Sequence, residues 1–225
     1  MTLSFRVLSA LIAYPEPELV EALGEGMAIL ERENLVPARE RRALMPLIDS
    51  LRDPDTLAVE ARYVALFDRR RSVSLHLYEH VHGESRDRGQ AMVRLKELYR
   101  LHGLEIEARE LPDYLPLFLE FLSMIPLKPA QSVLGEAMPI VAAIGQRLRE
   151  WKSPYAAVFD AIGALAKSRP SASDVETVLK ALPPEDDSSA ALDKRWEEEA
   201  VSFLGGTDPG GGCGAPSTNP ASPQR

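Results

Sequence analysis

The chain has 225 residues, of which 45% are hydrophobic and 27% charged, and its formal net charge at pH 7 is −8. This composition is that of a soluble globular protein large enough to bury one substantial core. The acidic balance disfavours nucleic acid as a partner, because that binding depends on neutralising phosphates with Lys and Arg. The single cysteine, Cys213, excludes an intramolecular disulfide and a cysteine-rich zinc site.

Residues 1–13 are apolar apart from one Arg, and their large apolar side chains recur at helical spacing. Because they lack the basic opening and cleavage site of a secretory signal, we expect the first core helix here. The longest apolar run, 115–127, is broken by Glu120 and Pro126 and falls short of the roughly 20 residues that cross a bilayer. We therefore expect a cytoplasmic protein that is not integral to a membrane.

Prolines and capping residues divide the next part of the chain into helices. Two prolines within 14–17 end the first helix, and a second amphipathic helix follows. Pro37 opens a third helix, which Pro46 interrupts. Asp53-Pro54 has the pattern of an N-cap and first helical position for a fourth. The arginines at 69–71 that follow it are expected to be a solvated helix end.

The remaining helices follow from the same signals. They are expected over about 89–101, 110–122, 130–151, 154–166, from Ser173-Asp174 to just before Pro183, and over 192–203. Asp113 is expected to cap the second of these, with Pro116 in its first turn, while Gly135 and Pro139 bend the third. No stretch alternates at period two. The prediction is an all-α, single-domain helical bundle over 1–203, followed by a disordered Gly/Pro/Ser-rich tail over 204–225.

The polar stretch 75–92 contains three of the four histidines and lies between two helical regions. His80 and His82, with nearby acids, suggest a zinc or iron site. In a helix, however, residues two apart point in different directions, and the chain has no second histidine pair to complete such a site. We therefore expect no bound metal and no cofactor. A metal-dependent enzyme that uses His80, His82 and nearby acids is the alternative hypothesis.

No catalytic constellation is evident either. Ser85 lacks the glycine two residues later that a nucleophile elbow requires, and no phosphate-binding loop occurs. We therefore predict a protein that is not an enzyme. Carboxylates at Glu79, Glu84 and Asp87 are suited to pairing with arginines of a partner. The competing interpretation is a loop whose charges pair among themselves, with Arg86 and Arg88 bound to Glu84 and Asp87.

Two segments resemble a known family. Residues 79–92, EHVHGESRDRGQAM, are similar to the signature of respiratory nitrate reductase assembly chaperones, the NarJ type or delta subunit. Residues 110–122, ELPDYLPLFLEFL, resemble the second family stretch, which the wider redox-enzyme maturation chaperones share in looser form. Further matches are Tyr63–Arg69, Tyr155–Asp160, Trp196–Glu199 and Cys213-Gly214. The resemblance extends from the first predicted helix to Phe203.

The resemblance implies an all-helical cytoplasmic chaperone that is absent from the finished enzyme. Such chaperones bind the N-terminal, twin-arginine-like segment of the catalytic (alpha) subunit. They support molybdenum cofactor insertion before membrane docking, with cofactor delivery proteins as further partners. The recognition residues implied for this chain are Glu79, His80, His82, Glu84, Arg86, Asp87, Pro112, Asp113 and Tyr114. Tyr114 stands where the wider family often has histidine, which argues against a titrating imidazole there. A regulatory interaction protein unrelated to redox enzymes is a third hypothesis.

Overall fold

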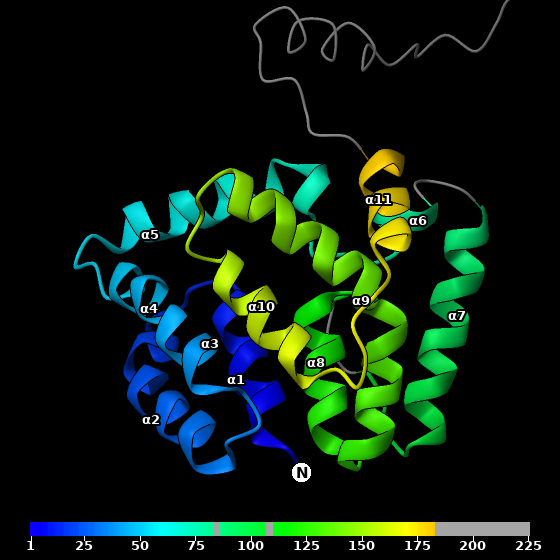
Figure 1. Cartoon of the computed structure of the whole chain (residues 1–225), viewed down its shortest axis with the longest axis horizontal. Helices are drawn as coiled ribbons and strands as arrows, with labels where there is room; N and C mark the ends of the chain where they lie inside the picture. The colour runs from blue at the N-terminus through cyan, green and yellow to red at the C-terminus, as the bar shows by residue number, and fades with distance from the viewer. Residues whose placement is uncertain (83–85, 107–109, 183–225) are drawn as a thin grey trace, which may run out of the picture. The chain divides into compact units, whose positions relative to one another are not determined.

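The computed structural model describes residues 1–82, 86–106 and 110–182, apart from the side chains of His82 and Arg86. Within these residues the regular secondary structure is helical, which confirms the predicted all-α fold (Figure 1). The helices are α1 (Leu3–Ile12), α2 (Pro17–Glu33), α3 (Ala38–Ala43), α4 (Met45–Leu51), α5 (Thr56–Tyr63), α6 (Glu79–His82), α7 (Arg86–Leu101), α8 (Leu115–Met124), α9 (Leu127–Glu150), α10 (Ala156–Leu165) and α11 (Ala172–Ala181). A π-helix, η1 (Val64–Asp68), and a 3₁₀ turn, η2 (Arg71–Val73), complete the described part.

Three sequence expectations lie outside the described residues. These are the helix at 192–203, the tail at 204–225 and the domain boundary between them. Among the described helices, none is long and apolar enough to cross a membrane.

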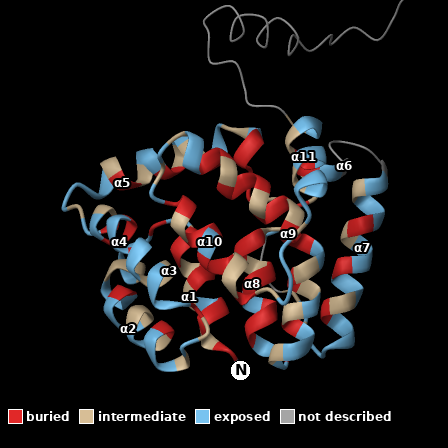
Figure 2. Cartoon of the chain, in the orientation of Figure 1, coloured by how far each residue is buried: buried red, intermediate tan, exposed pale blue. Residues whose placement is uncertain are grey.

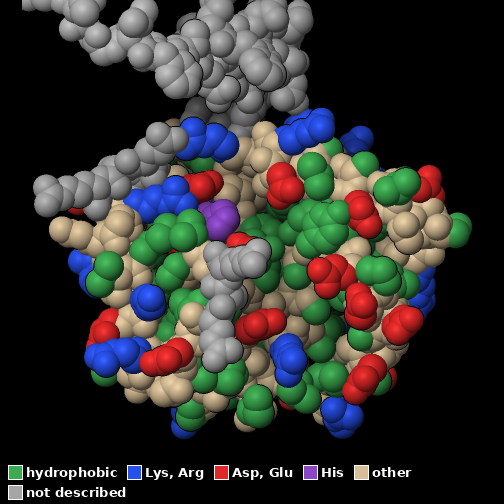
Figure 3. Space-filling view, turned by 180° about the vertical axis from the view of Figure 1, so that it is seen from behind, with side chains coloured by type: hydrophobic (Ala, Val, Ile, Leu, Met, Phe, Trp, Pro, Cys, Tyr) green, Lys and Arg blue, Asp and Glu red, His purple; other side chains and the backbone are tan. Residues whose placement is uncertain are grey.

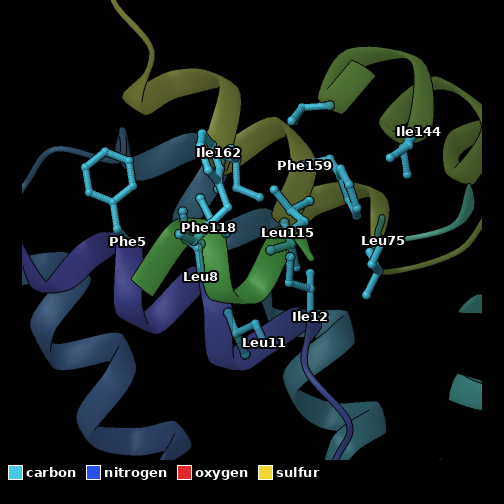
Figure 4. Packing of buried hydrophobic residues seen from close by; sticks show 14 of the residues in the cluster. Phe5, Leu8, Leu11, Ile12, Leu75, Leu115, Phe118, Ile144, Phe159 and Ile162 are labelled. Carbon is cyan, nitrogen blue, oxygen red and sulfur yellow. The ribbon is translucent and has the colours of Figure 1, made fainter. Parts of the chain in front are cut away.

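Helix α1 lies at the centre of the core, against α2, α8 and α10. One face of α1 carries Phe5, Leu8 and Ile12, which recur at helical spacing, and all three are fully buried. Leu8 and Ile12 meet Phe118 and Leu115 of α8 there (Figure 4). Burying one such side chain stabilises the fold by about 1.5–3 kcal/mol. Buried residues accordingly line the inner faces of α1, α8, α9 and α10 (Figure 2).

The N-terminus of α1 is capped by another helix. Thr2, the N-cap residue, makes no side-chain cap bond. Instead the carboxylate of Glu33, at the end of α2, accepts hydrogen bonds from the amides of Leu3 and Ser4 at 2.8 Å and from the Ser4 hydroxyl at 2.7 Å. Partial burial alone would raise the pKa of Glu33, but these hydrogen bonds lower it overall. The interaction fixes α2 against α1.

Prolines in the sequence predicted the starts of helices well, whereas the expected N-cap residues predicted them less well. Helix α3 begins directly after Pro37, as predicted. The interruption expected at Pro46 comes slightly earlier, because α3 ends at Ala43 and Pro46 lies in the first turn of the next helix, α4. The predicted start at Asp53-Pro54 is wrong, because the Asp53 side chain instead accepts a hydrogen bond from the Asp55 amide at 3.1 Å. Asp55 caps α5 by accepting a bond from the Ala58 amide at 3.1 Å.

Two later helices, in contrast, begin earlier than expected. Helix α7 starts at Arg86 and runs through Gly89, since an isolated glycine costs a helix only about 1 kcal/mol. The cap of α11 is Ser171, whose hydroxyl accepts a hydrogen bond from the Asp174 amide at 3.1 Å, so Ser173-Asp174 lies inside that helix. Helix α9 is continuous through Pro139.

Helices α9 and α10 approach each other closely at one glycine. A Cβ atom added to Gly145 of α9 would lie 2.9 Å from the Cβ of Phe159 on α10. Because the obstacle is a Cβ atom rather than the end of a flexible side chain, the helices would have to move apart. Gly135, in the same helix, has no atom within 4 Å of the corresponding position.

We predict that Gly145→Ala lowers the free energy of unfolding by about 1–3 kcal/mol, since the added methyl group overpacks the α9–α10 contact. Gly135→Ala is the matched control. It should leave stability unchanged or raise it by up to about 1 kcal/mol, because alanine is the better helix former. Urea denaturation of both variants measures the difference, and equal stabilities would contradict a close contact at Gly145.

Candidate partner-binding cleft

The polar stretch 75–92 lies beside the second family-like segment in the structure. An isolated antiparallel bridge joins His76 to Tyr114. The Leu77 amide donates to the Asp113 carbonyl at 3.0 Å, and the Leu115 amide donates to the Leu75 carbonyl at 2.8 Å. Residues 75–77 and 113–115 therefore run beside each other and bring the polar stretch to the start of α8.

The side chain of Asp113 is fully buried beneath this pairing. One of its oxygens accepts a hydrogen bond from the Tyr78 amide at 3.1 Å, and the other lies 3.4 Å from the Nδ1 atom of His76. Arg88 of α7 lies 4.0 Å away. Asp113 is thus neither the predicted cap of α8, which begins at Leu115, nor exposed to a partner. Its carboxylate holds the two segments together.

The contact with Asp113 favours the protonated form of His76. The hydrogen bond to Asp113 raises the pKa of His76 above its ordinary value of 6.5, against the opposing effect of partial burial. When the ring is protonated, it and the buried carboxylate stabilise each other. The ring of His76 also lies 5.4 Å from that of Tyr114, so the histidine occupies a fixed position at the surface.

Arg88 forms the second ion pair of the site. Its guanidinium donates to the Glu79 carboxylate at 3.1 Å, and both side chains are about four-fifths buried, with 18% and 20% exposed. The competing interpretation paired Arg88 with Glu84 or Asp87. In the described residues Arg88 makes this longer-range contact with Glu79, which joins α7 to α6. Asp87 is exposed, and Glu84 lies outside the described residues.

His80 and Pro112 make their contacts within the protein itself. His80 is 1% exposed, and its Nε2 atom lies 2.8 Å from the Ser74 carbonyl. The Pro112 carbonyl accepts a hydrogen bond from the Tyr99 hydroxyl at 2.7 Å, which holds the start of the second segment against α7. The side chains of His82 and Arg86 are outside the described part, so their predicted roles stay predictions.

A cleft of about 670 Å³ opens where these elements meet. Of the nine predicted recognition residues, Glu79 and Tyr114 line it. The described residues that line it are Tyr14, Tyr63, Phe67, Asp68, Arg71, Ser74, Leu75, His76, Glu79, Arg88, Glu110 and Tyr114. A space-filling view from behind shows a histidine beside acidic, basic and hydrophobic side chains on one face (Figure 3). Mixed polarity of this kind suits a peptide better than a small apolar ligand.

An aromatic cluster forms one wall of this cleft. The ring of Tyr63 lies 5.5 Å from that of Tyr14 and 5.0 Å from that of Phe67. The Tyr63 hydroxyl donates to the Ile12 carbonyl at 3.0 Å and lies 3.5 Å from the Tyr114 hydroxyl. Tyr63 therefore links the central helix α1 to the second family-like segment.

Several residues that line the cleft were not predicted from the sequence. Phe67 and Asp68 belong to the π-helix η1, a geometry that often occurs at functional sites. Arg71 was expected to be part of a solvated helix end, but it lines the cleft, and its neighbour Arg70 lies over the Trp151 ring at 4.6 Å. The available signal was the resemblance of residues 63–69 to the family, which carried no assigned role.

The cleft offers carboxylates and aromatic faces but no evident metal site. In the described ranges, no group of three His, Cys, Asp or Glu residues is arranged to hold a metal ion. Asp68, Glu79 and Glu110 supply negative charge beside the cations of Arg71 and Arg88, while the accessible aromatic surface comes from Tyr14 and Tyr114, with Tyr63 and Phe67 buried behind them. Carboxylates and aromatic faces are groups that can pair with basic side chains and form cation–π contacts.

Comparison with known proteins identifies relatives over most of the chain. The family described as nitrate reductase delta subunit matches residues 33–161. The chain is 41% identical to the nitrate reductase molybdenum cofactor assembly chaperone NarJ of Escherichia coli K12, over 92% of this chain and 86% of that protein. It is 30% identical to the probable chaperone of the same description from Bacillus subtilis, over 68% of this chain and 83% of that one.

A solved structure supports the fold. A putative redox enzyme maturation protein from Archaeoglobus fulgidus superposes with a TM-score of 0.52 and 23% sequence identity, covering 72% of this chain and 91% of that one. At this level of identity the likeness concerns the fold alone.

We predict that His76→Asn removes a pH-dependent part of the stability. Because the pKa of His76 is raised in the folded state, its stabilisation is complete below pH 6.5 and is lost as pH rises through the higher folded value. The melting temperature of His76→Asn should therefore lie furthest below that of the unmodified protein at acidic pH, and the gap should narrow toward alkaline pH. Thermal unfolding at several pH values measures it. His102→Asn, at an exposed histidine, is the control, and a gap independent of pH would refute the prediction.

We also predict that Asp113→Asn lowers the free energy of unfolding by about 1–3 kcal/mol. Asparagine has nearly the same shape but lacks the charge that faces His76 and Arg88. Asp87→Asn, at an exposed position of α7, should change it by less than about 0.5 kcal/mol. Urea denaturation compares the two. Equal effects would show that the buried carboxylate does not hold the segments together.

Proposed function

The chain belongs to the nitrate reductase delta subunit family, whose members are assembly chaperones rather than enzymes, and from this membership we propose its specific task. It binds the N-terminal segment of the apo catalytic subunit of respiratory nitrate reductase in the cytoplasm. It supports molybdenum cofactor insertion and complex assembly before membrane docking. Cofactor delivery proteins are further partners in this proposal. The observation that carries it is the 41% identity to an assembly chaperone over 92% of the chain.

The geometry of the cleft supports this proposal. It lies between the two family-like segments and combines carboxylates with an aromatic wall. A twin-arginine-like segment carries cations beside apolar residues, which this surface complements. Asp68 and Glu110 are exposed and available for pairing, whereas Glu79 already pairs with Arg88. We therefore assign the first contacts with partner arginines to Asp68 and Glu110.

The predicted recognition residues divide into two roles. Tyr114 and Glu79 line the cleft and are proposed to contact the partner. Asp113, His80 and Pro112 are proposed to position the cleft, since their described contacts hold the surrounding backbone in place. The exposed Asp87 is proposed to contact the partner at the edge of the site, together with His82, Glu84 and Arg86 in the same motif.

The proposed chaperone action rests on a difference in affinity for the immature and the mature partner. A protein that binds an immature partner more tightly than the mature one shifts the population toward the held state and then releases it. We propose that cofactor insertion orders the N-terminal segment of the catalytic subunit and thereby withdraws it from the cleft. No covalent step is required of the chaperone.

We predict that a synthetic peptide copying the N-terminus of the nitrate reductase catalytic subunit binds the full chain in isothermal titration calorimetry. The same peptide with its arginines replaced by glutamine should bind more weakly, because the carboxylates of the cleft lose their counterions. The absence of detectable heat at high micromolar peptide concentration would overturn the proposed function.

Variants of the acidic residues test the location of the site. Asp68→Asn and Glu110→Gln should each weaken peptide binding several-fold, up to about tenfold or 1.4 kcal/mol, with little change in melting temperature. Glu84→Ala and Asp87→Ala should also weaken binding without early unfolding. Glu18→Gln, at an exposed acid of α2 outside the cleft, is the control. Binding that is equal in all variants would place recognition elsewhere.

A further inference from the structure

Arg147 of α9 is a buried arginine that lies outside the cleft lining, and it is 1% exposed. Its Nη1 atom donates to the Ser72 carbonyl in η2 at 2.6 Å. Its Nη2 atom donates to the Leu179 carbonyl at 2.8 Å and to the Leu182 carbonyl. One rigid guanidinium therefore joins η2 to the end of α11, two segments that are far apart in the sequence.

Arg147 caps the C-terminus of α11. The last carbonyls of a helix have no partner within the helix, and a cation placed there also complements the negative end of the helix dipole. Leu179 lies in the last turn of α11, and Leu182 is its C-cap residue. Among the ten residues of α11, all of them described, Val178 alone is buried. Because a helix this short is marginally stable by itself, its position depends on tertiary contacts of this kind.

Ser72 connects the same guanidinium to the polar stretch. It is fully buried in η2, which leads into the polar stretch at residue 75. The Ser74 hydroxyl accepts a hydrogen bond from the His76 amide at 3.2 Å, and the Ser74 carbonyl lies 2.8 Å from the Nε2 atom of His80. Ser74 and His76 both line the cleft. Fixing Ser72 therefore fixes the backbone from which the polar side of the cleft is built.

Helix α11 reaches the polar stretch from another direction. It lies against α6, which begins with the cleft residue Glu79 (Figure 1). Both segments that Arg147 holds are thus connected to the polar stretch, η2 at its start and α11 at α6. Arginine suits this task because its planar fork of N–H donors can bond several acceptors at once, whereas lysine is a point charge on a flexible stem.

We propose that Arg147 is a positioning residue for partner binding, which holds the polar side of the cleft in its binding form by docking α11 and η2 together. The inference rests on the proposed function and adds a control on its affinity, the docking of α11. When the binding form is only a fraction of the population, the affinity is reduced by that fraction. Release of α11 therefore weakens partner binding without any change in the residues that touch the partner.

Two substitutions loosen α11 in different ways. Arg147→Met keeps an unbranched apolar stem but removes the guanidinium, and Val178→Ala removes part of the buried side chain of α11. Val36→Ala is the matched control, at a fully buried valine between α2 and α3 that lines no part of the cleft. Urea denaturation establishes that each chain is folded under the conditions of the measurements.

The first readout is the pKa of His76, followed by NMR titration of its ring and assigned with the His76→Asn variant. The contact with Asp113 raises this pKa above 6.5. We expect it to fall toward 6.5 in Arg147→Met and Val178→Ala, because the polar stretch loosens, and to stay unchanged in Val36→Ala. An unchanged pKa of His76 in all three variants would overturn the inference, whatever the partner is.

The second readout is calorimetry with the peptide from the catalytic subunit. We expect Arg147→Met and Val178→Ala to weaken binding about tenfold, which corresponds to a binding form reduced to about one molecule in ten, and Val36→Ala to leave binding unchanged. Equal binding by all variants, or equal weakening in the control, would show that Arg147 serves only the fold, while the proposed function stands. If the peptide does not bind the unmodified chain, the proposed function fails and this inference with it. If Arg147→Met does not fold, Val178→Ala decides against the same control.

Discussion

The cleft depends on one buried charge, the carboxylate of Asp113. A carboxylate placed inside a protein is strongly destabilising unless opposite charges and hydrogen bonds compensate for lost water. Asp113 obtains them from the Tyr78 amide, from His76 and from the more distant Arg88. These groups come from the polar stretch and from α7, so satisfying the carboxylate fixes both against the start of α8. The polar side of the cleft follows from this arrangement.

The hydrophobic core positions the aromatic wall of the cleft. Because α1 is buried at the centre of the described helices, its last turn is a rigid reference point, and the Ile12 carbonyl there accepts the Tyr63 hydroxyl. Tyr63 precedes η1 directly, and it also lies near the Tyr114 hydroxyl. Packing of apolar side chains in α1 thus determines where the π-helix and the aromatic cluster stand. The aromatic wall of the cleft is therefore positioned by core packing rather than by an independent loop.

The sequence predicted the helices better than it predicted the site, and the reason is physical. Helix starts such as Pro37 follow from local backbone sterics, which are readable within a few residues. The burial of Asp113 depends on contacts with a histidine 37 residues away, which no local pattern specifies. Asp113 therefore looked like a helix cap and His80 like an exposed ligand. Glu79 and Tyr114, which line the cleft, were among the predicted residues because they belong to the family-like segments, whereas Tyr14 and Arg71 gave no such signal.

The ion pair between Glu79 and Arg88 bears on the proposed release of the partner. A partner arginine that approaches Glu79 competes with Arg88, which already donates to it at 3.1 Å, so one charge pair replaces another. Such an exchange contributes little net affinity, because the Coulombic gain is offset by the pair that is broken. Affinity in the proposed function therefore comes mainly from the exposed acids and the aromatic wall. In the proposed function, Arg88 returns to Glu79 when the partner leaves, so that no buried charge is left without a counterion.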